Sequence, residues 1–273
     1  MTGRGSAASA PQNAARAAQD STVFRTLARI GYVVLGILHI LIGVISISIA
    51  TGGGGDADQG GAMEAIQKTP AGVVLLWVIV FGLLALGIWQ IAEAFLERDP
   101  DTKKRWGHRV KFIGTAIAYI AIAGTALIYA LGGRSESSDS SQTLSAQLLA
   151  APAGVAMLVL VGLVVAGIGI AFIVRGITRA FEKHLDLPAG VARRGIVAFG
   201  VVGYIAKGIA VGVAGILFIV AAFTHDPETA GGLDAALRAL AGLPFGAIIL
   251  WIVGAGLVLY GLFCFARARY ARM

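Results

Sequence analysis

The chain of 273 residues is 57% hydrophobic and only 14% charged, with a formal net charge of +7. Soluble domains carry about 25% charged residues, so this composition excludes an ordinary soluble protein. A positive charge of this size could also suggest nucleic-acid binding, so its distribution along the chain has to be considered first.

The N-terminal segment, residues 1–27, is rich in Ala, Ser, Gly and Gln, and we expect it to be a disordered cytoplasmic tail. Each apolar run after it has about the 20 residues that are needed to cross a bilayer. The six runs are 29–50, 71–95, 109–132, 153–179, 195–223 and 244–266. Backbone groups in lipid must be paired within their own segment, which favours helices. The sequence therefore predicts an all-α polytopic membrane protein with six transmembrane helices.

The basic residues gather at one end of these six runs. Only Lys68, Arg134 and Arg238 lie in the loops at the opposite end, which are net acidic. The other flanking Lys and Arg residues precede the first run, follow the last, or separate the second from the third and the fourth from the fifth. Since loops rich in Lys and Arg stay in the cytoplasm, we predict that both termini are cytoplasmic. The positive charge is then a topology signal, and we expect no nucleic-acid partner.

The six runs form three copies of a two-helix repeat, at residues 28–98, 105–183 and 193–270. The second run of each copy begins with Pro-x-Gly, at Pro70, Pro152 and Pro244, and the first runs align on Tyr32, Tyr119 and Tyr204. Pro suits the first turn of a helix, because its missing N–H would be unpaired there. A pair of spans returns the chain to the same side, so the copies are parallel and suggest a pseudo-threefold bundle.

Two further features accompany the repeat. A short amphipathic stretch precedes each Pro-x-Gly, most clearly at 232–240, and we expect it to form a short helix on the outer surface. Gly208, Gly212 and Gly215 lie at helical spacing in the fifth run, where small residues let two helix backbones approach closely. We interpret these glycines as a packing face.

The Gly-Tyr and Pro-x-Gly residues resemble a bacterial membrane family known as domain of unknown function 1206, whose members have three tandem two-helix modules. The matching residues are Gly31-Tyr32, Tyr119, Gly203-Tyr204 and the three Pro-x-Gly sites, and the resemblance covers about residues 28–270. The family often has a basic residue three positions after the Tyr. Here only Lys207 keeps it, whereas Leu35 and Ile122 do not. The resemblance implies the architecture and a bacterial plasma-membrane location, but no activity.

Among the ionisable residues within the apolar runs, Lys207, His39 and Glu93 are the candidates for a special role. Such groups are rare at membrane depth and are candidates for function. The alternatives are that Lys207 extends toward the cytoplasmic face or pairs with a carboxylate, and that His39 is a hydrogen-bonded packing residue rather than a proton relay. Glu93 stands 23 residues after its Pro, as Arg175 and Arg267 do after theirs. We therefore expect Glu93 to pair with one of these arginines.

The sequence shows no nucleophile–base pair, phosphate-binding loop or Cys/His cluster with metal-site spacing, and Cys264 is its single cysteine. We therefore expect no catalytic residues, no metal and no cofactor. The leading interpretation is a non-catalytic structural or accessory membrane component, whose partners are the lipid bilayer and other membrane proteins. The alternative is a small transporter or channel that uses Lys207 and His39 in a cavity of the bundle.

Overall fold

The computed structural model describes residues 22–96, 101–135 and 137–272. Six helices in this part of the chain are long and apolar enough to cross a membrane. They are α2 (Thr22–Ala50), α4 (Gly72–Leu96), α5 (Thr102–Ala130), α7 (Gly154–Ile177), α8 (Val191–Thr224) and α10 (Gly246–Tyr270). The prediction of an all-helical, six-span membrane protein is confirmed. Helix α2 begins at Thr22, so residues 22–27 of the expected tail are helical. Residues 1–21 of the expected tail lie outside the described part of the chain.

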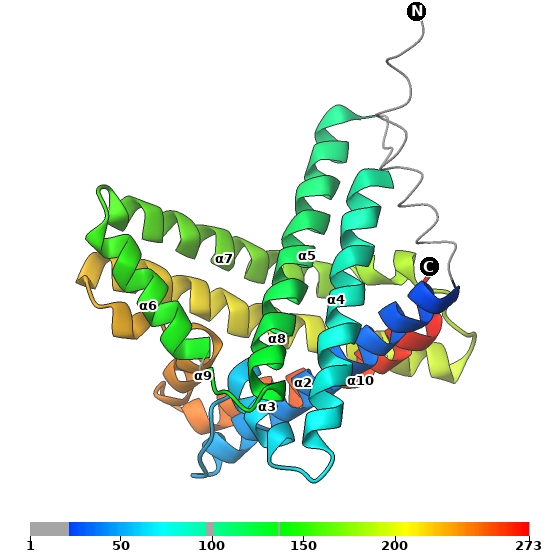
Figure 1. Ribbon diagram of the computed structural model, residues 1–273, viewed down its shortest axis with the longest axis horizontal. Coiled ribbons are helices and arrows are strands. Elements are labelled where there is room, and N and C mark those ends of the chain that lie inside the picture. The colour runs from blue at the N-terminus through cyan, green and yellow to red at the C-terminus, as the bar shows by residue number, and fades with distance from the viewer. Residues whose placement is uncertain (1–21, 97–100, 136, 273) are drawn as a thin grey trace, which may run out of the picture.

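Shorter helices lie at one end of the bundle, which we call the acidic end (Figure 1). They are α3 (Gln59–Gln67), α6 (Ser137–Ala150) and α9 (Gly232–Ala241), and each precedes a Pro-x-Gly, as predicted. The 3₁₀ helix η2 (Pro227–Ala230) is at the same end. The opposite end, which we call the basic end, holds the start of α2, the end of α10 and the 3₁₀ helix η1 (Ala180–His184) between α7 and α8.

The long helices form three intimate pairs, α10 with α2, α4 with α5, and α7 with α8. Each pair joins the second helix of one repeat to the first helix of the next, and the third repeat joins the first in the same way through α10 and α2. Glycines bring the backbones together: a Cβ on Gly36 would come within 2.7 Å of the Gly261 carbonyl oxygen, and one on Gly169 would come within 2.5 Å of the Gly212 nitrogen. A Cβ on Gly208 or on Gly215 would likewise collide with the backbone of α7, which confirms the packing role expected for these two glycines, whereas one on Gly212 would have no neighbour within 4 Å in the described chain.

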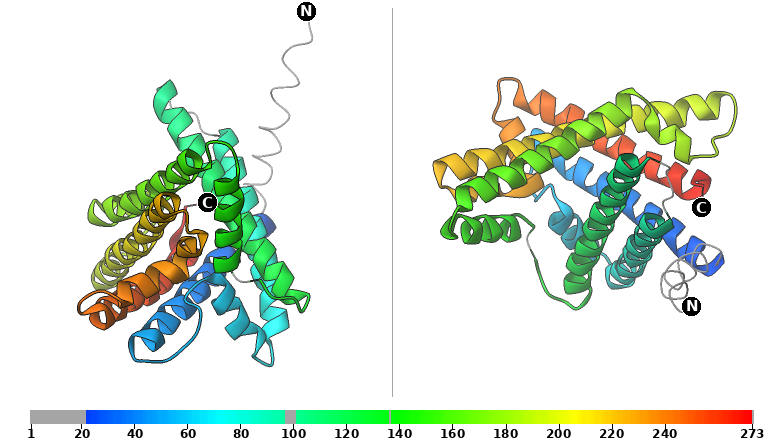
Figure 2. Two further views of the ribbon diagram at one scale, coloured as in Figure 1. Left: turned by 90° about the vertical axis from the view of Figure 1, so that its left-hand side faces the viewer. Right: turned by 90° about the horizontal axis from the view of Figure 1, so that it is seen from above.

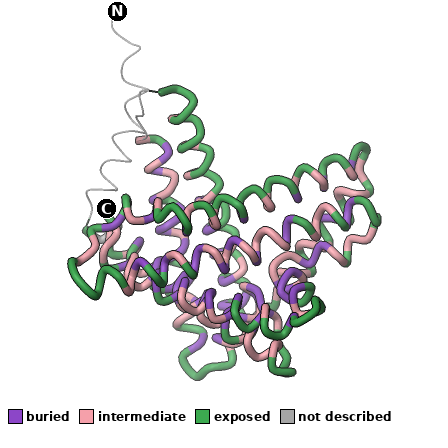
Figure 3. Tube along the Cα trace, turned by 180° about the vertical axis from the view of Figure 1, so that it is seen from behind, coloured by how far each residue is buried: buried purple, intermediate pink, exposed green. Residues whose placement is uncertain are grey.

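The second repeat departs from the threefold pattern. Helices α2 and α4 of the first repeat pack together, as do α8 and α10 of the third, but α5 and α7 share no comparable interface in the described residues. Figure 2 shows the α4–α5 pair splayed away from the α7–α8 pair. Only 28% of the most apolar stretch of α5 and 17% of that of α7 are buried, against 56% for α4. The bundle therefore has an open side, and exposed residues run along its projecting helices (Figure 3).

The Pro-x-Gly motif forms a tight turn, which corrects the expected role of its proline. Each helix begins at the glycine, two residues after the proline. In the second copy the Gly154 N–H donates to the carbonyl of Ala151 across 2.9 Å, and Ala153 has a positive φ of 60°. The fixed φ of proline suits the second position of such a turn. A Cβ on Gly154 would collide with the carbonyl of Leu148, which explains the glycine.

Candidate functional site

An aromatic cluster fills the region where α8, α10 and η1 meet. The rings of Tyr204 and Tyr260 are 5.2 Å apart, Tyr204 stacks on Phe181 at 5.4 Å, and Phe181 meets Phe263 edge-on at 5.0 Å. All four side chains are buried. Because aromatic faces carry partial negative charge, such a cluster can surround a cation without a carboxylate.

Lys207 extends from α8 into this aromatic region. Its Nζ lies 4.6 Å from the centre of the Tyr260 ring and 5.0 Å from that of Phe172 on α7. Both distances are within the range of cation–π attraction. The ammonium group thus lies against two aromatic rings, and no ion pair of Lys207 with a carboxylate is present among the described residues.

His39, on α2, contacts the same tyrosine. Its ring centre is 4.7 Å from that of Tyr260, and its Nδ1 lies 2.8 Å from the Leu35 carbonyl oxygen. The side chain is buried. The structure therefore brings Lys207 and His39 together around Tyr260, and the contacts of His39 are those of a hydrogen-bonded packing residue.

Two of the tyrosines that align the repeats contact an arginine that stands 23 positions after a Pro. Arg267 on α10 lies with its guanidinium carbon 4.4 Å from the ring centre of Tyr32 on α2, and its Nη2 donates to the Tyr32 hydroxyl across 3.2 Å. Arg175 on α7 lies 5.4 Å from the ring centre of Tyr204 on α8. One Tyr–Arg contact thus recurs at two interfaces between neighbouring repeats.

Glu93 holds the third of these positions, on α4. This helix packs chiefly against α2 and α5, whereas Arg175 and Arg267 lie on α7 and α10 and face tyrosines. The pairing of Glu93 with one of these arginines stays a prediction. The sequence identified the aligned tyrosines and the residues 23 positions after each Pro. It did not show that members of the two sets contact one another, because the contact crosses from one repeat to the next.

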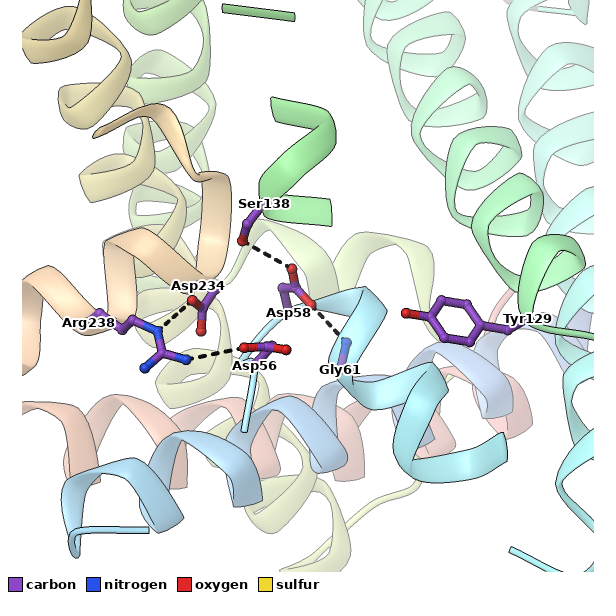
Figure 4. A pocket seen from close by; sticks show the side chains of 7 residues that line it. All are labelled: Asp56, Asp58, Gly61, Tyr129, Ser138, Asp234 and Arg238. Atoms are coloured by element: carbon purple, nitrogen blue, oxygen red, sulfur yellow. Dashed lines mark hydrogen bonds and ion pairs between the residues drawn. The ribbon is translucent and has the colours of Figure 1, made fainter. Parts of the chain in front are cut away.

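A polar junction at the acidic end joins all three repeats (Figure 4). Asp58 caps α3 by accepting from the Gly61 N–H at 2.9 Å, and the Ser138 hydroxyl of α6 lies 3.5 Å from its other oxygen. Asp234 of α9 accepts from the Ala57 N–H at 2.8 Å and from Arg238 Nε at 2.6 Å. The residues surround a cavity of about 220 Å³.

The electrostatics of this junction raise the pKa of the Asp58 carboxyl above its ordinary value. Burial raises the pKa of the Asp58 carboxyl, the nearby charges of Asp234 and Asp56 raise it further, and the Gly61 N–H opposes them. Arg238 balances the other two carboxylates, since its Nη2 lies 3.2 Å from Asp56 Oδ1. The sequence had marked these aspartates only as members of acidic loops, and nothing in their spacing indicates that they converge.

Within the described residues, no group of three or more His, Cys, Asp or Glu side chains is placed to hold a metal ion. Whether the protein binds a cofactor stays a matter of prediction.

Comparison with known proteins identifies relatives but no activity. The chain is 32% identical over 251 residues, 90% of each chain, to a protein described as "Uncharacterized protein YxxB" from Bacillus subtilis (strain 168). No solved structure matches the chain. A family model described as "Domain of Unknown Function (DUF1206)" matches it three times, at residues 30–97, 110–179 and 202–271. The chain therefore belongs to the DUF1206 family and contains three copies of its repeat.

Proposed function

We propose that the protein is a non-catalytic structural or accessory component of the bacterial plasma membrane, which acts by presenting the open side of its second repeat to another membrane protein. The observation that carries this proposal is that α5 and α7 lack, among the described residues, the interface through which their counterparts pack together in the other two repeats. We infer that both termini are cytoplasmic from the basic residues that flank the helices.

The composition of the open side supports a helix-binding role. Exposed apolar side chains include Ile117 of α5, at 63%, and Leu163 of α7, at 57%. A Cβ added to Gly124 of α5 or to Gly167 of α7 would have no neighbour within 4 Å in the described chain, so both positions leave the backbone open to close approach. Small residues on exposed helix faces are typical of interfaces between membrane helices.

Photocrosslinking in native membranes tests this proposal. A benzoylphenylalanine at Ile117 or at Leu163 should capture one and the same protein, which should also co-purify stoichiometrically in mild detergent. The matched control is Ile252, which is exposed to the same degree, at 62%, on α10, a helix that packs against α2, α8 and α9. Equal capture from Ile252, or different proteins from the two test positions, would contradict a specific docking face.

A transporter is the second candidate, and the convergence of Lys207 and His39 on Tyr260 favours it. The two candidates are separated by Lys207→Met. The accessory role predicts that the same partner co-purifies with wild type and with the variant. Transport predicts a charged-solute flux in liposomes that disappears with Lys207→Met, with no stoichiometric partner.

A further inference from the structure

The interface that the second repeat lacks is built around two glycines in each of the other repeats. In the first repeat, a Cβ on Gly31 of α2 would collide with the Gly82 carbonyl of α4, and one on Gly82 would come within 3.1 Å of the Gly31 Cα. In the third repeat, a Cβ on Gly203 of α8 would come within 2.6 Å of the backbone of α10. A Cβ on Gly256 of α10 would collide with the Ala206 side chain of α8. Glycine at these two positions therefore lets the two helices of one repeat approach closely.

The packing of α5 on α4 identifies the counterparts of these positions in the second repeat. A Cβ on Gly87 of α4 would lie 3.5 Å from the Ala116 carbonyl oxygen and 3.0 Å from the Ile120 side chain. In the other two helix pairs, the glycine at the same distance from its proline meets the residues four and eight positions after the aligned tyrosine. Ala116 and Ile120 stand four and eight positions after Phe112. Phe112 is therefore the structural counterpart of those tyrosines.

Phe112 thus replaces Tyr119 in the alignment of the repeats, which corrects the alignment expected from the sequence. Phe112 stands 40 residues before the proline of its repeat, as Tyr204 does, whereas Tyr119 stands only 33 residues before it. The two aromatic residues are seven positions apart, which is nearly two helical turns. They therefore share one face of α5, and the sequence pattern alone did not separate them.

Lys111 and Val164 occupy the two glycine positions in the second repeat. Lys111 directly precedes Phe112, as the glycine of the first helix directly precedes the tyrosine in the other repeats. Val164 stands 12 residues after its proline, as Gly82 and Gly256 do. Both side chains are exposed on their helices. Because a long and a branched side chain separate the two backbones, α5 and α7 do not reach the close contact that two glycines allow.

The neighbouring part of the α5 face is still suited to close packing. Gly114 is the counterpart of Ala206, which contacts Gly256 in the third repeat, and a Cβ on Gly114 would have no neighbour within 4 Å in the described chain. The face that α5 would turn toward α7 is therefore smaller at this position than its counterpart on α8. Lys111 and Val164 are the bulky replacements on the two facing helices.

We propose that Lys111 and Val164 keep the second repeat open, because they replace the two glycines through which the helices of a repeat pack together. Glycine at both positions lets α5 pack against α7 and closes the ring of repeats. The consequence for docking rests on the proposed function: closure covers the face that receives the partner protein. Lys111 and Val164 are thus positioning residues for the docking face.

Distance measurements on the purified full-length chain test this proposal. Spin labels are attached to Lys103→Cys of α5 and Ile177→Cys of α7, both exposed positions, in a Cys264→Ala background. Double electron–electron resonance in lipid nanodiscs reports the distance between the labels. Adding Lys111→Gly and Val164→Gly together should shift the distance distribution to shorter values, because the axes of packed helices lie only about 8–10 Å apart.

Two further variants make the measurement specific. Ile113→Gly with Ile170→Gly removes two exposed apolar side chains from the same helices. Ile113 is two positions after Lys111 and Ile170 is six after Val164, so both point to other sides of their helices, and the distances should stay unchanged. Lys111→Ala with Val164→Ala leaves a methyl group at each position and should give a smaller shift in the same direction. This pair keeps the test available if the two glycines prevent folding.

Photocrosslinking from Ile117 separates this inference from the proposed function. The counterparts of Ile117, Ile37 and Ile209, are partly buried in the other repeats, so closure should reduce capture of the partner. A shortened distance with lost capture supports both proposals. A shortened distance with unchanged capture supports the role of Lys111 and Val164 but contradicts docking on the open side. An unchanged distance in the glycine and alanine variants, or an equal shift in the control, overturns the inference whether or not a partner is captured.

Discussion

The cations inside this bundle are accommodated by tyrosine and phenylalanine rings. A lysine at the centre of a membrane helix is unfavourable by roughly 2.5–3.5 kcal/mol on insertion scales. A desolvated cation–π contact contributes about 2 kcal/mol. The two rings against Lys207 can therefore offset most of this cost. Tyr260 is the central residue, because it contacts both Lys207 and His39.

The ring of Tyr260, rather than its hydroxyl, should carry this stabilisation. We expect Tyr260→Leu to lower the free energy of unfolding in detergent by about 3 kcal/mol, from lost packing and the lost cation–π contact. Tyr260→Phe keeps the ring and should cost less than about 1 kcal/mol. Thermal or denaturant unfolding of the two variants measures the difference. Equal destabilisation would show that the hydroxyl matters instead.

The junction at the acidic end should make stability depend on pH. Because the pKa of Asp58 is raised in the folded state, its stabilising contribution is complete below the pKa of the unfolded chain. That contribution is lost as the pH rises through the raised value. Asp58→Asn keeps an acceptor for the Gly61 N–H and removes the charge. We expect this variant to melt at a higher temperature than wild type at pH 7, with a smaller advantage at pH 4.

The control for this experiment is Asp139→Asn, which removes one carboxylate from an exposed position on α6. Melting curves of wild type and both variants at the two pH values give the comparison. An advantage of Asp58→Asn that is equal at both pH values would rule out the protonation of Asp58 as its cause.

At the scale of helices, glycine contacts allow the paired helices to approach closely. The α7–α8 and α2–α10 interfaces both place glycine against backbone of the partner helix, so larger residues at these positions would force the helices apart. The sequence revealed the glycine spacing, but the same spacing fits any neighbour. Which helix is the neighbour depends on the shape of the complete interface.

A matched pair of substitutions on α7 tests this packing. A Cβ at Gly169 would collide with the backbone of α8, whereas nothing in the described chain lies within 4 Å of one at Gly167. We expect Gly169→Val to destabilise the protein by about 3 kcal/mol, the upper end for overpacked sites. Gly167→Val should have little effect. Unfolding in detergent and the size-exclusion profile check the prediction, and similar behaviour of the two variants would contradict the α7–α8 interface.

At the scale of the whole molecule, both ends have a distinct character. The acidic end holds α3, α6 and α9, and the basic end holds the start of α2, the end of α10 and the α7–α8 connection (Figure 1). This arrangement is compatible with the orientation that we infer from the basic residues, in which the basic end faces the cytoplasm.

Cysteine labelling in intact cells tests that orientation. The native thiol of Cys264 is buried, so an added cysteine dominates the signal. A membrane-impermeant maleimide should label Asp139→Cys on α6 in intact cells, and should label Arg194→Cys on α8 only after permeabilisation. Wild type controls for labelling of Cys264. The reverse pattern would contradict cytoplasmic termini.

The sequence by itself determined the six spans, the three repeats and the short helix before each Pro-x-Gly. These features depend on local hydrophobicity, on segment length and on residues such as Pro70, Pro152 and Pro244, which recur at fixed spacing. It also marked Lys207, His39 and Glu93 as unusual, because an ionisable residue in an apolar run is conspicuous without any tertiary contact.

Only the tertiary structure decided how the repeats meet. The cation–π contacts of Arg175 and Arg267, the convergence of Lys207 and His39 on Tyr260, and the junction of Asp58 with Ser138 and Asp234 all cross between repeats. The three copies have similar patterns, so the sequence predicts a regular ring. The packing of side chains, which differs between copies, leaves α5 and α7 apart and opens one side of the bundle.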